Sequence, residues 1–260
     1  MRFRPAAWRL VLAVGGFGVN AASAAPAPAV KPFFEPNFPF FQSQVEVAPR
    51  TSETIPDGNF VVRGIIIPLA SGQVLLFDQE LLRVAAVWER AAEAPPITLR
   101  TMAQISYDDG LKKASGVHPT PTGPLVMATP QHPGVASSLA DLFNDPRISY
   151  PGDAGRGPLP PTQARFLGVE LADNVPILHY TVGKTEILEW HESQGSTGGA
   201  DFFRHWEVGP AAEPVGFALG RASAGAWQLK TPGLATVVSE STEKTPQALQ
   251  VRSLTPGLTL

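Results

Sequence analysis

Glycine and proline interrupt this chain at short intervals, and their spacing limits it to short elements of secondary structure. The 260 residues include 24 glycines and 27 prolines, with β-branched and apolar runs between them. Proline is disfavoured in helix interiors and central strands, and both residues favour turns. Short apolar runs bounded by turn residues are typical of strands. The chain is therefore expected to be all-β.

The clearest run is 60–67, which is rich in valine and isoleucine and ends at Pro68. The stretch 78–94 would suit a helix capped by Asp78, but its neighbours favour a turn followed by a strand at 83–88. Other strands are expected at residues 73–77, 97–101, 104–107, 125–129, 165–171, 202–208, 215–219, 226–230, 235–239 and 248–254. Residues 108–163 contain ten prolines and are expected to be largely irregular.

Residues 175–190 predict a β-hairpin, because two apolar-rich runs flank Gly183-Lys184, which suits a type II′ turn. That turn places Tyr180 opposite Ile187 and Leu178 opposite Glu189. The opposite face mixes apolar residues with His179 and Glu186. With its neighbours, this hairpin predicts a two-sheet sandwich of antiparallel meanders. A partial β-propeller is the alternative, since strands bounded by glycine also fit propeller blades.

The first 24 residues have the layout of a secretory signal peptide. Arginines at positions 2, 4 and 9 precede the apolar run 10–19, and Ala22-Ser23-Ala24 supplies small residues before a cleavage site. Ten apolar residues are too few to cross a hydrocarbon layer of about 30 Å as a helix. The mature protein is therefore expected to be exported, periplasmic or extracellular, with no membrane span after cleavage.

Three segments follow from this division. Residues 1–24 are the signal peptide, and residues 25–58 form a linker or strap rich in proline and phenylalanine. The strap is expected to pack on the domain that follows, with a partner-binding peptide as the alternative. The β-rich domain is expected over 59–260. Because strand-like runs continue close to Leu260, we expect that domain to be truncated at its C-terminus.

Charge and cysteine content exclude several functions. Removing residues 1–24 takes away three arginines and no acid, so the formal net charge falls from −3 to −6. A nucleic-acid binder needs a basic surface, so nucleic acid is not an expected partner. The chain has no cysteine, which excludes disulfides and a C-x-x-C-H haem attachment. We expect no cofactor within this chain.

Catalytic motifs are absent from the sequence. The five histidines have no metal-ligand spacing, and no G-x-S-x-G, P-loop or G-x-G-x-x-G is present. No metal site is expected, and no catalytic residue is assigned. Carboxylates beside an aromatic residue could bind or cleave a sugar, and an arginine in the rigid loop 155–161 could hold an acidic partner. The candidate ligand-facing residues are His179, Glu186, Glu189, Trp190 and Arg156.

The alternative interpretation of these candidates is structural. Glu186 and Glu189 would then be solvent-exposed positions of a strand, and Arg156 would cap backbone carbonyl groups.

A series of short segments forms a collinear pattern. They are, in order, Asn37-Phe38-Pro39-Phe40-Phe41, Val62-Arg63-Gly64-Ile65, Phe77-Asp78, Leu81-Leu82-Arg83, Trp88, Ser106-Tyr107-Asp108, Asp145-Pro146-Arg147, 155–161, Tyr180-Thr181-Val182-Gly183, Thr185-Glu186-Ile187-Leu188-Glu189, Phe203-Arg204 and Val208-Gly209-Pro210. Together they resemble the N-terminal β-rich domain of large secreted bacterial multidomain proteins of uncharacterised function. The resemblance covers roughly residues 33–220 and implies neighbouring c-type cytochrome or sugar-directed modules, which are not present here. It carries over no catalytic residue.

These observations favour a non-catalytic structural or ligand-binding β module of an exported multidomain protein. Its expected partners are downstream domains of the same polypeptide, with a c-type cytochrome or polysaccharide-related module among them, and a carbohydrate ligand. One alternative is a carbohydrate-active enzyme that uses carboxylates near Glu186–Glu192. Another is a free-standing periplasmic protein that binds a small ligand.

Overall fold

The computed structural model describes residues 38–48, 58–99, 101–102, 118–148, 155, 157–196, 199–218, 227–231, 234–239 and 247–252. All of them belong to one unit, Asn37–Leu260. The signal peptide, residues 25–37 of the strap and the strand expected at 104–107 lie outside the described residues. Arg156 also lies outside them.

The first sheet has five antiparallel strands in chain order. Its strands are β1 (Phe41–Ala48), β2 (Asn59–Pro68), β3 (Gln73–Asp78), β4 (Arg83–Glu89) and β5 (Leu125–Ala128). The strand interpretation of residues 83–88 is therefore confirmed. β1 comes from the segment that the sequence placed before the domain, and it pairs along β2 as one of the two edge strands.

The prediction of a strand at 97–101 is wrong for the residues that the structure describes there. Ile97 and Thr98 belong to no strand, and residues 101–102 form a turn. Two prolines precede Ile97 and leave two positions without a backbone N–H to donate. Thr98 and Thr101 then close a local turn, because the Thr101 N–H donates to Thr98 Oγ1 over 3.2 Å and the Met102 N–H donates to the Thr98 carbonyl over 3.0 Å.

The second sheet is a four-stranded antiparallel meander in the order β10-β9-β8-β7. It contains β7 (Ala164–Ala172), β8 (Val175–Val182), β9 (Thr185–Ser196) and β10 (Gly199–Val208). The predicted register is confirmed, since Tyr180 lies opposite Ile187 and Leu178 opposite Glu189. Gly183 has a φ of +56° whereas Lys184 has a negative φ, which is the pattern of a type II′ turn.

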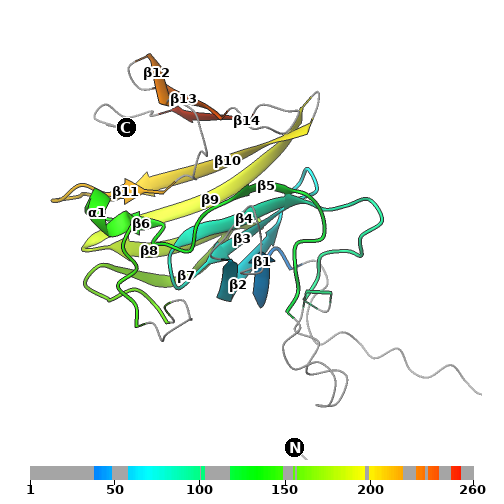
Figure 1. Cartoon of the computed structure of the whole chain (residues 1–260), viewed down its shortest axis with the longest axis horizontal. Helices are drawn as coiled ribbons and strands as arrows, with labels where there is room; N and C mark the ends of the chain where they lie inside the picture. Colours follow the sequence, from blue (N-terminus) through cyan, green and yellow to red (C-terminus); the bar gives the residue numbers. More distant parts are fainter. Residues whose placement is uncertain are drawn as a thin grey trace, which may run out of the picture. The chain divides into compact units, whose positions relative to one another are not determined.

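The two sheets share one hydrophobic core, as the layers in Figure 1 illustrate. The first sheet contributes residues such as Ile65 and Phe77, and the second contributes Leu178, Tyr180 and Ile187, all fully buried. Rings of Phe77 and Tyr180 stack across it with centroids 6.1 Å apart. A core shared by two antiparallel meanders is that of a sandwich, so this predicted fold is confirmed over the propeller alternative.

A second apolar cluster covers the other face of the five-stranded sheet. It includes Val61, Leu76, Trp88 and Met102, each at most 1% exposed. Because both of its faces are buried, β3 is buried at every position. Continuous apolar runs such as 74–77 are the sequence signature of a strand with two buried faces.

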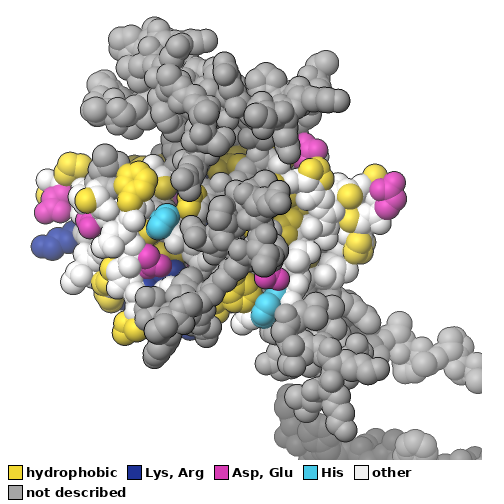
Figure 2. Space-filling view, in the orientation of Figure 1, with side chains coloured by type: hydrophobic (Ala, Val, Ile, Leu, Met, Phe, Trp, Pro, Cys, Tyr) yellow, Lys and Arg dark blue, Asp and Glu magenta, His cyan; other side chains and the backbone are white. Residues whose placement is uncertain are grey.

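Shorter elements complete the described chain. β6 (Val135–Ala136) pairs with β11 (Gly216–Phe217), and helix α1 (Leu139–Leu142) follows β6. A further sheet contains β12 (Trp227–Thr231), β13 (Leu234–Ser239) and β14 (Gln247–Arg252). Their residue ranges overlap those of the three strands expected in this part of the sequence. No helix in the described part is long and apolar enough to cross a membrane. In the space-filling view, acidic side chains appear at several separate points and basic ones mainly at one side (Figure 2).

Candidate functional site

The strand alternation of β8 and β9 divides the candidate ligand-facing residues between two faces of the four-stranded sheet. Successive side chains of a strand point to opposite faces. With the observed register, His179, Glu186 and Trp190 share the face that points away from the sandwich core. We call it the outer face. Glu189 lies on the opposite, core-facing side, and Arg156 is not among the described residues.

Three aromatic rings stack across the outer face. Trp190 on β9 lies directly opposite His205 on β10. Their ring centroids are 5.2 Å apart, and the ring planes differ by 8°. The Phe203 ring continues the row, with its centroid 6.4 Å from that of His205, and Phe203 is 40% exposed. This aromatic row offers apolar ring surface on the outer face, where Phe203 is exposed and Trp190 and His205 are half-buried.

Carboxylates lie beside both histidines of the outer face. His179 Nδ1 on β8 is 3.6 Å from Oε1 of Glu170 on β7. His205 Nε2 is 3.7 Å from Oε2 of Glu192 on β9. Both glutamates are mostly exposed, so these contacts are loose pairs at the surface. Their carboxylate oxygens remain accessible to a ligand.

Glu189 has a different environment, because its carboxylate is fully buried between the two sheets. Tyr180 Oη donates a hydrogen bond of 2.7 Å to Oε2, and His191 Nε2 lies 2.7 Å from Oε1. Arg204 Nε donates to Oε1 over 2.9 Å, and its Nη2 lies 2.8 Å from the same oxygen. The interpretation of Glu189 as an exposed strand position is therefore wrong.

These contacts shift the pKa values of the whole cluster. Burial alone would raise the pKa of Glu189, but the charge of Arg204 and the hydrogen bonds of His191 and Tyr180 lower it to about 2. Burial lowers the pKa of His191, and Glu189 opposes that change. Burial, together with the charge of Glu189, raises the pKa of Tyr180 well above its usual value. At neutral pH the cluster is a fixed Glu189–Arg204 ion pair.

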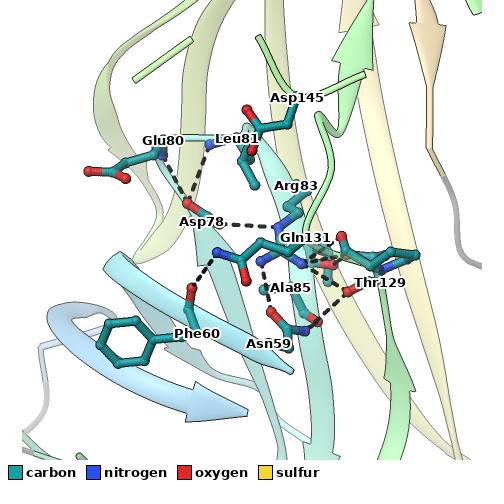
Figure 3. Close-up of polar contacts among 12 residues, drawn as sticks. Asn59, Phe60, Asp78, Glu80, Leu81, Arg83, Ala85, Thr129, Gln131 and Asp145 are labelled. Carbon is teal, nitrogen blue, oxygen red and sulfur yellow. Dashed lines mark hydrogen bonds and ion pairs between the residues drawn. The ribbon is translucent and has the colours of Figure 1, made fainter. Parts of the chain in front are cut away.

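A second buried charge cluster lies at one end of the five-stranded sheet (Figure 3). Arg83 at the start of β4 donates from Nε to Oδ2 of Asp78 over 3.1 Å and from Nη2 to Oδ1 of Asn59 over 2.8 Å. Its Nη1 donates to the carbonyl oxygens of Thr129 and Pro130, each over 2.9 Å. The guanidinium thus joins β2, β3 and the segment after β5.

Asp78 also organises the turn between β3 and β4. Its Oδ1 accepts the backbone N–H groups of Glu80 and Leu81 over 3.0 and 3.3 Å. Asparagine and aspartate commonly form such turns with their own backbone. Asp78 therefore binds a turn through one oxygen and Arg83 through the other, which explains an aspartate at this buried position.

The proline-rich region 108–163 contributes a third buried arginine, Arg147. Arg147 Nη1 lies 3.3 Å from Oε2 of Glu80, and its Nη2 lies 2.8 Å from Oδ2 of Asp145. Burial by itself would raise the pKa of Asp145, but hydrogen bonds from Arg147 lower it. The backbone N–H of Gly157 donates to the same Glu80 oxygen over 3.0 Å. These contacts attach the loops around residues 145 and 157 to the β3–β4 turn.

A small pocket lies next to this attachment. Its cavity volume is about 240 Å³, and its wall includes Arg63 on β2, Glu80, Leu159 and Phe166 on β7. Glu80 is already paired with Arg147, and Arg63 Nε lies 3.6 Å from its other oxygen. The carboxylate of Glu80 is therefore already engaged by two arginines.

Sequence reasoning missed the partners of both buried clusters. Arg204 and Tyr180 come from strands on either side of Glu189, and Asp78 and Arg83 flank a turn that the sequence predicted only as a turn. One signal was present for Glu189, since the predicted register placed it opposite Leu178 on the core side. Within the described ranges, no group of three or more histidines and carboxylates is placed to hold a metal ion.

The architecture is that of a two-sheet β-sandwich whose charged clusters are internal and whose four-stranded sheet has an open aromatic face. A family model described as a domain of unknown function (DUF6797) matches residues 75–189, from β3 into β9. The matched residues make up less than half of the chain. They include the turn that follows Asp78 and the turn at Gly183. No curated protein and no solved structure matches the chain.

Proposed function

We propose that the chain is a non-catalytic ligand-binding β module of an exported multidomain protein, and that its ligand is a polysaccharide bound on the outer face. The observation that carries this proposal is the stacked row of Trp190, His205 and Phe203 on the open side of the four-stranded sheet. Aromatic rings stack on the apolar faces of sugar rings, and adjacent carboxylates accept hydrogen bonds from hydroxyl groups.

The arrangement of the carboxylates favours binding over glycoside hydrolysis. Glu186 and Glu192 are six residues apart on one strand, which places them roughly 20 Å apart. The two carboxyl groups of a glycosidase are about 5 to 9.5 Å apart. Glu189 lies on the other face, and a pKa of about 2 makes it a poor general acid. For Glu186, Glu189 and Glu192, the carboxylates that the sequence singled out, this placement favours the non-catalytic module over the carbohydrate-active enzyme.

A free-standing binding protein for a small ligand is also less favoured. Sites for small organic ligands commonly enclose about 300 to 1,000 Å³ and carry a few convergent polar groups. The pocket beside Arg63 is about 240 Å³, and Glu80 within it is already paired with Arg147. An open sheet face suits an extended polymer better than a small molecule.

The setting of the module is part of the proposal. The leader pattern of residues 1–24 supports export to the periplasm or beyond. The resemblance to N-terminal domains of secreted bacterial proteins supports neighbouring modules of the c-type cytochrome or polysaccharide-related kind. The match to a domain of unknown function agrees with this resemblance on one point, because both concern an uncharacterised domain.

Affinity electrophoresis through gels that contain neutral, acidic or amine-bearing polysaccharides tests the proposal. We expect at least one polysaccharide to retard the protein, and we expect Trp190→Ala to abolish the retardation. Phe143→Ala is the control, because Phe143 follows α1 and is 71% exposed. Its retardation should equal that of the wild type. Equal retardation of Trp190→Ala, or no retardation by any polymer, would refute the proposed function.

A further inference from the structure

The outer face carries a strong excess of negative charge. By register, β7 to β10 place five acids on it, and all five are exposed: Glu170, Glu186, Glu192, Asp201 and Glu207. On these four strands, Arg165 is the one lysine or arginine of this face that the structure describes. Such a face repels polyanions and attracts cations.

Acids and rings are mixed on this face. Glu192 lies directly opposite Phe203, and Glu207 lies two residues from His205 on β10. The centres of protein–protein interfaces are depleted in glutamate and aspartate, which instead occupy the rim. Carboxylates interleaved with an aromatic row therefore favour a hydrated, cationic and extended ligand over the apolar surface of a folded partner.

The distances favour a polymer. Glu186 and Glu192 are roughly 20 Å apart along β9, so a ligand that reaches both must be several sugar units long. Protonated amines at intervals along that ligand could pair with the carboxylates while its sugar rings stack on Trp190.

From this charge pattern we infer that the outer face selects a polysaccharide with free amino groups, of the glucosamine type. The inference rests on the proposed function and specifies its ligand. Each interaction is a surface ion pair, so each contributes little and is screened by salt. Selectivity arises because several ion pairs form with a single polysaccharide molecule.

Binding to four soluble polymers tests the inference: a glucosamine oligomer with protonated amines, the same oligomer after N-acetylation, polygalacturonate and polylysine. We expect N-acetylation to weaken binding about tenfold, through loss of the charge-dependent part. We expect no binding of polygalacturonate. Glu186→Gln/Glu192→Gln should bind the amine form only as well as the acetylated form. Glu93→Gln, an exposed acid between β4 and β5, should behave as the wild type.

Each other outcome has a distinct meaning. Equal affinity for the amine and acetylated oligomers would overturn the charge selectivity and leave the proposed function in place. Affinity for polylysine equal to that for the glucosamine oligomer would also overturn the inference and assign the face to a basic protein. If no polymer of any charge binds, the proposed function fails together with the inference.

Discussion

Arg204 on β10 and Glu189 on β9 form an ion pair inside the sandwich, with Arg204 Nε 2.9 Å from Glu189 Oε1. The Arg204 guanidinium also lies 4.7 Å from the ring centroid of Trp206. Its Nη1 donates to the carbonyl oxygen of Ala218 over 3.3 Å. The pair therefore connects the four-stranded sheet to the segment after β11, and its role is to order that side of the core.

Glu189→Gln is expected to destabilise the protein strongly. The substitution leaves the Arg204 guanidinium buried without a counter-charge, and loss of one partner of a buried pair typically costs about 3 to 5 kcal/mol. The free energy of unfolding, measured by urea titration at pH 7, checks this. Glu186→Gln on the outer face is the control and should lie within about 0.5 kcal/mol of the wild type. Equal stability of the two variants would contradict a structural role for Glu189.

Acid should remove the contribution of this cluster. The native pKa of Glu189 is about 2 against an ordinary value of 4.5, so the carboxylate stabilises the fold above pH 4.5. That contribution is lost as the pH falls from 4.5 toward 2. The pKa of His191 is also lowered, so protonation of this residue favours the unfolded chain below about pH 6.5.

Urea titrations at several pH values measure this effect as the stability difference between the wild type and Glu189→Gln. We expect that difference to shrink steadily below pH 4.5. A difference that stays constant down to pH 2.5 would show that Glu189 is not held ionised by Arg204.

Arg83 and Asp78 should show strong coupling. Arg83→Met leaves a buried Asp78 oxygen without its partner and should cost about 3 to 5 kcal/mol. In the double variant with Asp78→Asn, the Asn carbonyl oxygen can still accept from Glu80 and Leu81, and the stranded charge is gone. We expect its loss of stability to be smaller than the sum of the single losses by at least about 1 kcal/mol. Additive losses in a double-mutant cycle would contradict the pair.

Gly134 is expected to tolerate no side chain. A Cβ atom there would lie 2.2 Å from the Leu82 carbonyl oxygen, because the segment before β6 passes directly over the start of β4. Overpacking of this kind typically costs about 1 to 3 kcal/mol, so Gly134→Ala should lower the melting temperature. Gly168→Ala is the matched control, since a Cβ at that bulge meets nothing within 4 Å. Equal melting temperatures of the two variants would show that the segment before β6 does not pack closely against the start of β4.

The fold was more predictable than the site because its signals are local. Gly183-Lys184 and the strand alternation around it determine a hairpin register without tertiary information. β1 was harder, because prolines before Phe41 suggested an extended strap, whereas the following residues pair with β2. The side chain of Met102 fills the second core from a segment with no strand at all.

The buried clusters depend on contacts that sequence cannot supply. Arg83 donates to the carbonyl of Thr129, 46 residues later, through a proline-rich region without periodicity. For Glu189, the sequence signal of burial was the alternation of side chains between the two faces of a strand. Positions 186 and 189 are an odd number of residues apart and must point to opposite faces. Of these two glutamates, only Glu186 could therefore join Trp190 on the outer face.

Polysaccharide retardation of Trp190→Ala and Glu189→Gln, at a temperature where both variants are folded, tests the central claim most directly. If the outer face binds the ligand and the buried cluster only supports the sandwich, Trp190→Ala loses retardation and Glu189→Gln keeps it. The reverse pattern, with binding retained by Trp190→Ala and lost by Glu189→Gln, would contradict the account.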